Sequence, residues 1–237
     1  MRQLLRERAE RRKSGLFAVE GDHLCGELSG AELFLYTEKA QAKYSDTVKR
    51  LCAACRDSFC ITEELAEYIS DTKSSQGLFA ASEMTWKCIP DSAKKLVVLD
   101  GVQDPGNVGT VIRTAEALGF DGLIFTGACA DVFSPKVLRS SMGSALRMPM
   151  EEVSREKLKD KLSGFAAYAA MLDDTAARLG EERFPEKTAV IIGSEGAGVS
   201  AEAAALCEKK LYIPISGAES LNAAAAAAII LWEISKG

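Results

Sequence analysis

The residues of this chain that could do chemistry lie in three glycine-rich loops, and the first of these runs into a helical pattern. Residues 100–109 read DGVQDPGNVG, and Asn107 and Arg113 lie slightly less than two helical turns apart. Glycine lets the backbone approach a ligand closely, and the amides at the start of a helix favour an anion. The loop therefore predicts either an anion-binding site or a plain structural turn.

Two common nucleotide-binding patterns do not fit this loop. The fingerprint G-x-G-x-x-G is absent, and Asp121 comes before the next predicted strand rather than after it, so no acid is placed for a ribose. A phosphate-binding P-loop is not expected, because no G-K-[ST] follows. A nicotinamide-dependent enzyme remains a hypothesis on the glycine content alone, and saturable NADH binding would favour it.

The second and third loops also follow apolar runs and carry polar side chains. Residues 193–198 read GSEGAG and include Glu195, while residues 213–222 include Ser220 and Asn222. The G-x-S-x-G pattern of many serine hydrolases is absent, and the only histidine of the chain lies near its N-terminus. A Ser-His-Asp triad is therefore not expected.

The cysteines give no clear metal-binding pattern. The chain has 7 of them, and the pair Cys52 and Cys55, followed by Cys60, lies in a helical pattern without a fourth ligand nearby. We therefore expect core packing and no metal. The arginine-rich start of the chain lacks the apolar core of a signal peptide, which favours reduced thiols and a cytoplasmic protein.

Composition and charge indicate an ordinary globular protein. The chain has 237 residues, of which 47% are hydrophobic and 27% charged, and its net charge is −5. No apolar run reaches the roughly 20 residues of a membrane helix, so no membrane association is expected. The net charge alone argues against non-specific coating of nucleic acid, although basic residues can still form a local surface on an acidic body.

Each of the three loops is expected to follow a buried strand of one sheet. From residue 96 onward, short apolar runs alternate with helical patterns. The predicted strands are residues 96–99, 122–125, 165–172, 189–192 and 211–215, and the predicted helices are residues 108–118, 134–146, around 158, 201–208 and 221–235. Such alternation is typical of an α/β fold with a parallel sheet, whose ligands bind beyond the carboxyl ends of the strands.

The first part of the chain predicts a separate, smaller α/β unit. Its predicted strands are residues 16–19, 31–36 and 78–81, and its predicted helices are residues 22–28, 44–58 and 63–69. Residues 83–95 are irregular and form the candidate linker. We therefore expect two domains, residues 1–91 and 92–237. The arginine-rich residues 1–13 are either a solvated helix or a basic arm near an RNA backbone.

Taken together, the three loops resemble the motifs of the SpoU (TrmH-like) family of RNA 2′-O-ribose methyltransferases, within the SPOUT superfamily. The matching stretches are LDGVQDPGNVGTVIRTAEALGF, IIGSEGAGVS and IPISGAESLNAAAAAAIILWEI. SPKVLRSSMGSALRMP, between the first two, also looks like family sequence, so the resemblance covers the chain from residue 96 onward. RRKSGLFAVEG and SDTKSSQGLFA resemble the small L30e-like substrate-binding domain that many members carry.

The resemblance implies a fold and a cofactor. It implies a deep trefoil knot in the C-terminal domain, S-adenosyl-L-methionine held in a bent form by the knotted loops, and a homodimer whose active site draws on both subunits. The residues implied to bind the cofactor are Met171, Gly193, Glu195, Gly196, Ile213, Ile215 and Leu221. The residues implied to be catalytic are Arg113, Asn107, Glu195, Ser220 and Asn222.

The implied reaction is transfer of a methyl group to a ribose 2′-OH, whose proton must be removed or polarised because a neutral hydroxyl is a poor nucleophile. The resemblance gives this role to Arg113. Because arginine is normally protonated, two accounts stay open: it loses a proton transiently with help from an RNA phosphate, or it stays charged and stabilises the developing alkoxide. Asn107 would orient Arg113 or the ribose, and Glu195 would hold the guanidinium in a bidentate pair.

Ribosomal RNA is the expected substrate, because the first domain resembles that of the ribosomal members. Transfer RNA is the alternative, as is an RNA-binding protein of the same fold without catalysis. The candidate RNA contacts come from the N-terminal arm, a polar loop and the segment around residues 134–147, and each has a plain alternative as surface charge. They are Arg11, Arg12, Lys73, Gln76, Lys136, Arg139 and Arg147.

Overall fold

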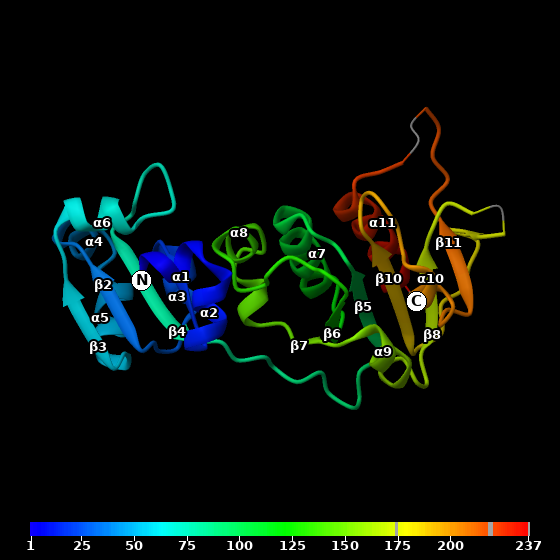
Figure 1. Cartoon of the computed structure of the whole chain (residues 1–237), viewed down its shortest axis with the longest axis horizontal. Helices are drawn as coiled ribbons and strands as arrows, with labels where there is room; N and C mark the ends of the chain where they lie inside the picture. The colour runs from blue at the N-terminus through cyan, green and yellow to red at the C-terminus, as the bar shows by residue number, and fades with distance from the viewer. Residues whose placement is uncertain (174, 218–219, 237) are drawn as a thin grey trace. The chain divides into compact units, whose positions relative to one another are not determined.

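The computed structural model describes residues 1–173, 175–217 and 220–236, which form two compact units (Figure 1). The first unit consists of residues 1–85 and 131–146, and the second of residues 86–130 and those from 147 onward. The chain thus passes from the first unit to the second near residue 85. No sequence pattern indicated that residues 131–146 would pack with the first unit.

The first unit contains a mixed sheet of strand order β1-β4-β2-β3. Strand β4 (Leu78–Glu83) runs antiparallel to β1 (Leu16–Glu20) and to β2 (Leu33–Tyr36), and β3 (Asp57–Cys60) runs parallel to β2. Its helices are α1 (Arg2–Arg6), α2 (Arg8–Ser14), α3 (Asp22–Glu27), α4 (Glu38–Lys43), α5 (Ser45–Ala54), α6 (Glu63–Ile69), α8 (Pro135–Ser140) and the 3₁₀ helix η1 (Ser144–Leu146).

The second unit contains a sheet of order β7-β6-β5-β10-β8-β11-β9, and every strand pair in the described residues is parallel. The strands are β5 (Lys95–Asp100), β6 (Gly122–Thr126), β7 (Met150–Glu152), β8 (Ala166–Ala170), β9 (Ala177–Arg178), β10 (Thr188–Gly193) and β11 (Lys209–Tyr212). The helices are α7 (Pro105–Ala117), α9 (Arg155–Lys161), α10 (Ala201–Ala204) and α11 (Ala223–Ser235). The predicted parallel α/β sheet is confirmed.

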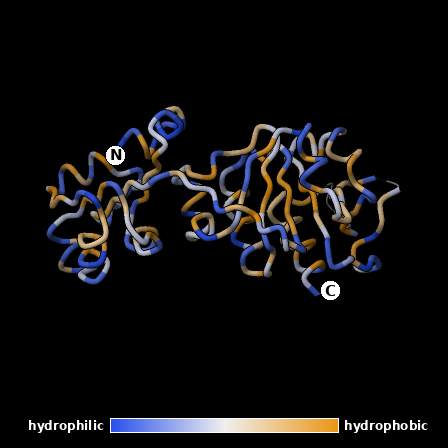
Figure 2. Tube along the Cα trace, turned by 90° about the horizontal axis from the view of Figure 1, so that it is seen from below, coloured by the Kyte–Doolittle hydropathy of each residue, from blue (hydrophilic) through white to orange (hydrophobic). Residues whose placement is uncertain are grey.

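Both faces of the central strands β5, β6 and β10 are buried, which explains why these strands are mostly apolar (Figure 2). On one face Val98 and Ile191 pack against Leu158 of α9 and Ala203 of α10. Side chains alternate along a strand, so the residues next to Val98 in β5 and next to Ile191 in β10 point to the opposite face. On that face α7 and α11 pack against each other. The carboxyl ends of the central strands are therefore held between two helical layers.

Helix α11 (Ala223–Ser235) is the most apolar helix of the second unit. Ala227, Ile230 and Leu231 are buried, whereas Ile229 and Trp232 are 42% and 56% exposed. With 13 residues the helix is shorter than a bilayer span, and no helix in the described part of the chain has the length and hydropathy to cross a membrane. The solvent-facing side of α11 thus carries exposed apolar side chains.

Three predicted helices are shorter than expected, each for a local reason. The helix predicted over residues 44–58 ends at Ala54, because residues 57–60 form β3 beside β2. The one predicted over residues 134–146 ends at Ser140, since Met142 and Gly143 both have positive φ. The one predicted over residues 201–208 ends at Ala204, because β11 already begins at Lys209. The trefoil knot stays a prediction.

Candidate functional site

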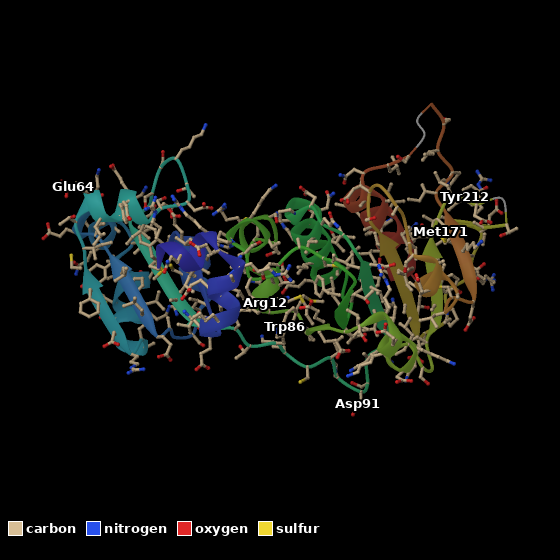
Figure 3. The ribbon with its side chains drawn as sticks, viewed as in Figure 1. Arg12, Glu64, Trp86, Asp91, Met171 and Tyr212 are labelled. Atoms are coloured by element: carbon tan, nitrogen blue, oxygen red, sulfur yellow. The ribbon has the colours of Figure 1, made fainter. Side chains whose placement is uncertain are left out.

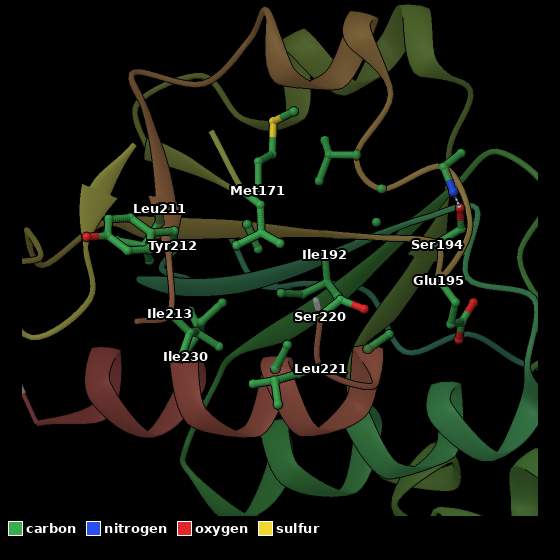
Figure 4. A pocket seen from close by; sticks show the side chains of 18 of the residues that line it. Met171, Ile192, Ser194, Glu195, Leu211, Tyr212, Ile213, Ser220, Leu221 and Ile230 are labelled. Carbon is green, nitrogen blue, oxygen red and sulfur yellow. Dashed lines mark hydrogen bonds between the residues drawn. The ribbon is translucent and has the colours of Figure 1, made fainter. Parts of the chain in front are cut away.

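A pocket of about 400 Å³ lies in the second unit, at the carboxyl ends of β8, β10 and β11. This volume is within the usual range of small-molecule sites, roughly 300–1,000 Å³. Met171 directly follows β8 and Tyr212 ends β11, and both are labelled in Figure 3. Figure 4 shows Tyr212 and Glu195 at opposite ends of the pocket, with Leu221 and Ile230 on the side of α11.

The pocket gathers residues that are far apart in the sequence. It is lined by every residue for which the resemblance implied a cofactor contact: Met171, Gly193, Glu195, Gly196, Ile213, Ile215 and Leu221. Ser220 also lines it. Ala218 and Glu219, from the third motif, lie outside the described residues. The walls are largely apolar, and Glu195 supplies a carboxylate, so the pocket suits a ligand with a flat apolar part and a cationic part.

The loop after β10 closes tightly on itself and forms one wall of the pocket. The backbone amide of Ser194 donates to the carbonyl oxygen of Gly198 (3.1 Å), and the amide of Gly198 donates back to that of Ser194 (2.9 Å). The amide of Ala197 donates to Ser194 Oγ (3.2 Å; Figure 4). A Cβ on Gly193 would lie 2.0 Å from the carbonyl carbon of Gly198. Glycine is therefore required at position 193 for this loop to close.

Asp100, at the end of β5, fixes both ends of the same loop. It lies beside Gly193 in the sheet register, and its Oδ2 accepts from the amide of Ser200 (2.8 Å). Its Oδ1 accepts from Nε (3.1 Å) and Nη2 (2.8 Å) of Arg155. Burial alone would raise the pKa of this carboxyl, but the hydrogen bonds from Ser200 and Arg155 outweigh it and hold the pKa below its usual value.

We expect Asp100→Asn to lower the free energy of unfolding at pH 7 by about 2 kcal/mol, since charge-assisted hydrogen bonds each contribute about 1.5–3 kcal/mol. Because the pKa of Asp100 is lower in the folded than in the unfolded chain, the carboxylate stabilises the fold above its unfolded pKa. That contribution is lost as the pH falls through the folded value. The difference between wild type and variant should therefore shrink below about pH 4.

Urea unfolding of wild type and Asp100→Asn at pH 7 and pH 3.5 measures this difference. Asp160→Asn is the matched control, because Asp160 is exposed and its side chain makes no hydrogen bond or ion pair within the described part of the chain. A pH-independent difference for Asp100→Asn would contradict the assigned charge state.

Three polar side chains from different elements meet beside the pocket. Asn107 Nδ2, in the first turn of α7, donates to Glu195 Oε1 in the loop after β10. Asn222 Nδ2 donates to Asn107 Oδ1 (3.0 Å), while Asn222 Oδ1 caps α11 by accepting from the amides of Ala224 and Ala225. Both amide groups are thus fixed in orientation. The cluster joins one residue from each of the three motifs.

Arg113 does not join this cluster within one chain. It is exposed on α7 and makes no hydrogen bond or ion pair with the described residues, and Glu195 pairs with Asn107 instead of holding the guanidinium. Six residues advance a helix by about 9 Å and rotate it by about 240°, so Asn107 and Arg113 lie on different faces. The expected bidentate pair between Glu195 and Arg113 is absent from the described residues of the single chain.

Of the candidate RNA contacts, one is buried and the others lie at least partly at the surface. Arg11 is a correction: it is 3% exposed, its guanidinium lies 2.7 Å from Asp131 Oδ2, and it donates to the carbonyl oxygen of Leu4. Arg11 therefore joins α2 to Asp131 inside the first unit and is not available to RNA. Arg12 on α2 and Lys136 on α8 are exposed, as is Lys73.

Arg139, Gln76 and Arg147 each bond to another residue of their own unit. Arg139 Nη2 donates to Asp71 Oδ2 (3.1 Å), and Gln76 Oε1 accepts from the amide of Asp22 (2.7 Å), both within the first unit. In the second unit, Arg147 forms a bidentate pair with Glu116, with both distances 2.8 Å.

Sequence reasoning missed three residues that shape the site, namely Asp100, Arg155 and Tyr212. A signal existed for Asp100, because it is a carboxylate at the end of an entirely apolar strand, a position where a charge needs a partner. Nothing in the sequence indicated that Arg155 would be that partner. No group of histidine, cysteine and acidic side chains among the described residues has the arrangement of a metal site.

Comparisons with known proteins agree with this geometry. Residues 94–232 match the model of the SpoU rRNA Methylase family, and residues 2–80 match that of the MRM3-like substrate binding domain. The chain is 32% identical over 233 residues to the 23S rRNA (guanosine(2553)-2′-O)-methyltransferase RlmP of Bacillus subtilis, covering 97% of this chain and 92% of that protein.

Two solved structures extend the comparison. The SpoU methyltransferase AviRb from Streptomyces viridochromogenes, in complex with the cofactor AdoMet, has a TM-score of 0.85 and 30% identity, covering 99% of this chain and 95% of that one. A structure concerning 2-OH methylation of C/U34 on tRNA has a TM-score of 0.54 and 29% identity, covering 60% of this chain and 94% of that one. The family model matches residues 94–232, and a relative 32% identical to this chain aligns over 97% of it. The chain therefore belongs to the SpoU rRNA Methylase family.

Proposed function

We propose that this protein transfers a methyl group from S-adenosyl-L-methionine to a ribose 2′-OH of ribosomal RNA. The observation that carries the proposal is the pocket at the strand ends, with the cluster of Asn107, Glu195 and Asn222 beside it. A relative of nearly full coverage is named for this reaction on 23S rRNA. Transfer RNA is the second candidate, supported by a structural neighbour that covers 60% of this chain.

The residues of the pocket fit S-adenosyl-L-methionine. When bound, this cofactor supplies an electrophilic methyl group on a sulfonium cation. Apolar side chains such as Ile192, Ile213 and Leu221 suit its adenine, and the exposed backbone of residues 194–198 suits its polar edges. The carboxylate of Glu195 gives the pocket a negative charge, which suits a cationic ligand.

The polar cluster would hold the RNA ribose and the group that acts on it. Asn107 and Asn222 are held by each other and by the cap of α11, so their amides need no reorganisation when the substrate binds. Arg113 would act on the 2′-OH, either as a transient base or as a cation beside the developing alkoxide. Ser220, which lines the pocket, would complete the polar edge.

A homodimer would bring Arg113 to the pocket of a second copy. Arg113 is exposed on α7, next to α11, whose outward side carries Ile229 and Trp232. An exposed tryptophan and isoleucine on one helix side are typical of an interface. We therefore propose that α7 and α11 form a two-fold contact, within a catalytic domain that carries the trefoil knot.

We expect Trp232→Lys to convert the dimer to monomers, because a two-fold contact places the new charge close to its own copy. The methylation rate should fall at least about tenfold, since Arg113 would no longer reach a second pocket. Light scattering after size exclusion measures the mass. Leu65→Lys, which alters a 43% exposed leucine of the first unit, is the control and should stay dimeric. A monomeric wild type would contradict the interface.

The first domain would bind RNA, and the proposed boundary near residue 91 would end its first segment, with residues 131–146 as its second. This agrees with the match of residues 2–80 to a substrate binding domain. The exposed cations Arg12, Lys73 and Lys136 remain proposed contacts. So do Arg139 and Arg147, which would share their guanidinium groups with their acidic partners. A cytoplasmic location fits an enzyme acting on ribosomal RNA.

Mapping of 2′-O-methylation tests the function. Ribosomal and transfer RNA from cells with and without the gene are compared by alkaline-resistance sequencing. We expect one ribosomal position to lose its methyl group when the gene is deleted. The same position should regain the methyl group when the purified protein and S-adenosyl-L-methionine are added. Loss at a transfer RNA position alone would favour the second candidate, and failure to bind S-adenosyl-L-methionine by calorimetry would favour an RNA-binding protein without catalysis.

A further inference from the structure

The C-terminal end of helix α8 carries a methionine where glycine is usual. The amide of Met142 donates to the carbonyl oxygen of Arg139 (3.1 Å), and the amide of Gly143 donates to that of Leu138 (3.3 Å). This pair of bonds is the Schellman motif, and it places Met142 at the left-handed position, with φ of 50°. Among the described residues, Met142 is the one non-glycine residue with a positive φ.

A methionine with a strained backbone conformation calls for an explanation outside the helix end itself. Glycine would adopt this conformation without strain, so the backbone gains nothing from a methionine. The Met142 side chain is also not needed for the core, because the residue is 43% exposed. The position therefore favours a role for the side chain on the surface.

Three segments of the first unit converge on Met142. His23 Nε2, in α3, donates to the carbonyl oxygen of Met142 (3.2 Å), and Arg139 of α8 binds Asp71 (3.1 Å) in the loop before β4. The same loop supplies Gln76 to the start of α3 (2.7 Å). Each segment is thus bonded to the other two. We call this the three-segment surface: residues 22–23, 71–76 and 139–142.

A buried carboxylate keeps the loop of this surface in place. Glu20, at the end of β1 and 8% exposed, accepts from Ser70 Oγ (2.5 Å), from the amide of Asp71 (3.0 Å) and from Thr72 Oγ1 (2.9 Å). These bonds fix the start of the loop before Asp71 reaches Arg139. The three-segment surface is therefore built in advance of any ligand.

The chemistry of the surface favours an RNA nucleotide. His23 and Lys73 are exposed, and Lys73 makes no hydrogen bond or ion pair within the part of the chain that the structure describes. Arg139 uses one guanidinium nitrogen for Asp71 and keeps other N–H groups for a phosphate. The two acids of the surface are already bonded, Asp22 to Thr47 and Asp71 to Arg139. An apolar side chain beside the remaining donors of Lys73 and Arg139 suits an unstacked base with its phosphate nearby, and methionine adapts to such a flat partner.

We propose that the three-segment surface binds the RNA substrate and that Met142 packs against an unstacked base of it. The inference rests on the proposed function and adds a contact to it: residues 139–142, which lie between two strands of the catalytic sheet in the sequence, complete the RNA surface of the first unit. A protein partner is the competing occupant.

Met142→Gly isolates the side chain, because glycine keeps the backbone of the helix end. We expect its melting temperature to be at least that of wild type and its affinity for S-adenosyl-L-methionine to be unchanged. Its affinity for ribosomal RNA prepared from cells lacking the gene should fall about 5- to 10-fold. Met142→Leu, which restores an apolar side chain of similar volume, should bind this RNA within about twofold of wild type.

Phe59→Ala is the matched control, since Phe59 is a 55% exposed apolar residue of the first unit outside the three-segment surface. Its RNA affinity should not change. If Met142→Gly binds RNA with wild-type affinity, the inference is overturned and the methyltransferase proposal stands. The same holds if Met142→Gly keeps its RNA affinity but no longer binds a protein partner that wild type binds. If wild type itself neither binds nor methylates the RNA, both proposals fail.

Discussion

Arg113→Ala is expected to reduce the rate of RNA methylation by at least about 100-fold, as loss of a group that stabilises developing charge does in other enzymes. The affinity for S-adenosyl-L-methionine should stay within about twofold of wild type. The reason is geometric: Arg113 is exposed on α7 and does not line the pocket of its own chain. Transfer of a labelled methyl group to undermethylated ribosomal RNA measures the rate, and calorimetry measures the affinity.

Arg183→Ala serves as the control for this variant. Arg183 is another exposed arginine of the second unit without a hydrogen bond or ion pair to the described residues, so its removal changes the net charge equally. Its rate should match wild type. Wild-type turnover by Arg113→Ala would remove Arg113 from the reaction. A large loss of cofactor affinity would show that Arg113 acts on the cofactor instead of on the ribose.

Gly193→Ala is expected to abolish cofactor binding, with a loss of at least about 100-fold in affinity. The added Cβ would lie 2.0 Å from the carbonyl carbon of Gly198 and 2.1 Å from the amide nitrogen of Val199, and backbone atoms cannot rotate away as side chains do. The loop would have to open, which also costs about 1–3 kcal/mol of stability. Calorimetry with S-adenosyl-L-methionine and thermal unfolding measure the two effects.

Gly196→Ala provides a graded comparison in the same loop. A Cβ on Gly196 would meet no atom within 4 Å, so the loop can keep its shape. The affinity should fall at most about tenfold. Equal losses in the two variants would mean that any methyl group in the loop blocks the ligand and that closure at Gly193 is not the cause.

The sheet could be predicted from the sequence because its physical signal is local. Strands buried on both faces need apolar residues throughout, and the runs at residues 96–99 and 189–192 have that composition. Strands β3 and β9 were missed for the opposite reason. Every residue of β3 is exposed, and β9 has only 2 residues, so neither carries a hydrophobic pattern.

The residues of the candidate site could be predicted from the sequence, but the contacts between them could not. The family resemblance implied that Gly193, Ile213 and Leu221 contact one ligand, and they line one pocket because strand ends of a parallel sheet meet at one edge. The partner of Glu195 was not foreseen. Spacing along α7 does not reveal which face of the helix meets the loop after β10, and that choice decides between Asn107 and Arg113.

Residues 131–146 could not be assigned from the sequence either. Their motif resembles the catalytic part of the family, yet the segment packs with the first unit. Phe133 lies against Phe17 with ring centroids 5.2 Å apart, and Arg11 pairs with Asp131. Such long-range packing depends on tertiary contacts, which a local pattern does not report.

This shared segment limits how the protein can be divided or recombined. A truncation at residue 92 would remove the partners of Phe133, Val137 and Leu138, all of them buried, and would expose these apolar side chains on the remaining fragment. A chimaera that exchanges the first domain would have to exchange residues 131–146 with it. The two units therefore cannot evolve independently. A different substrate domain would require matching changes at residues 131–146, inside the catalytic sequence.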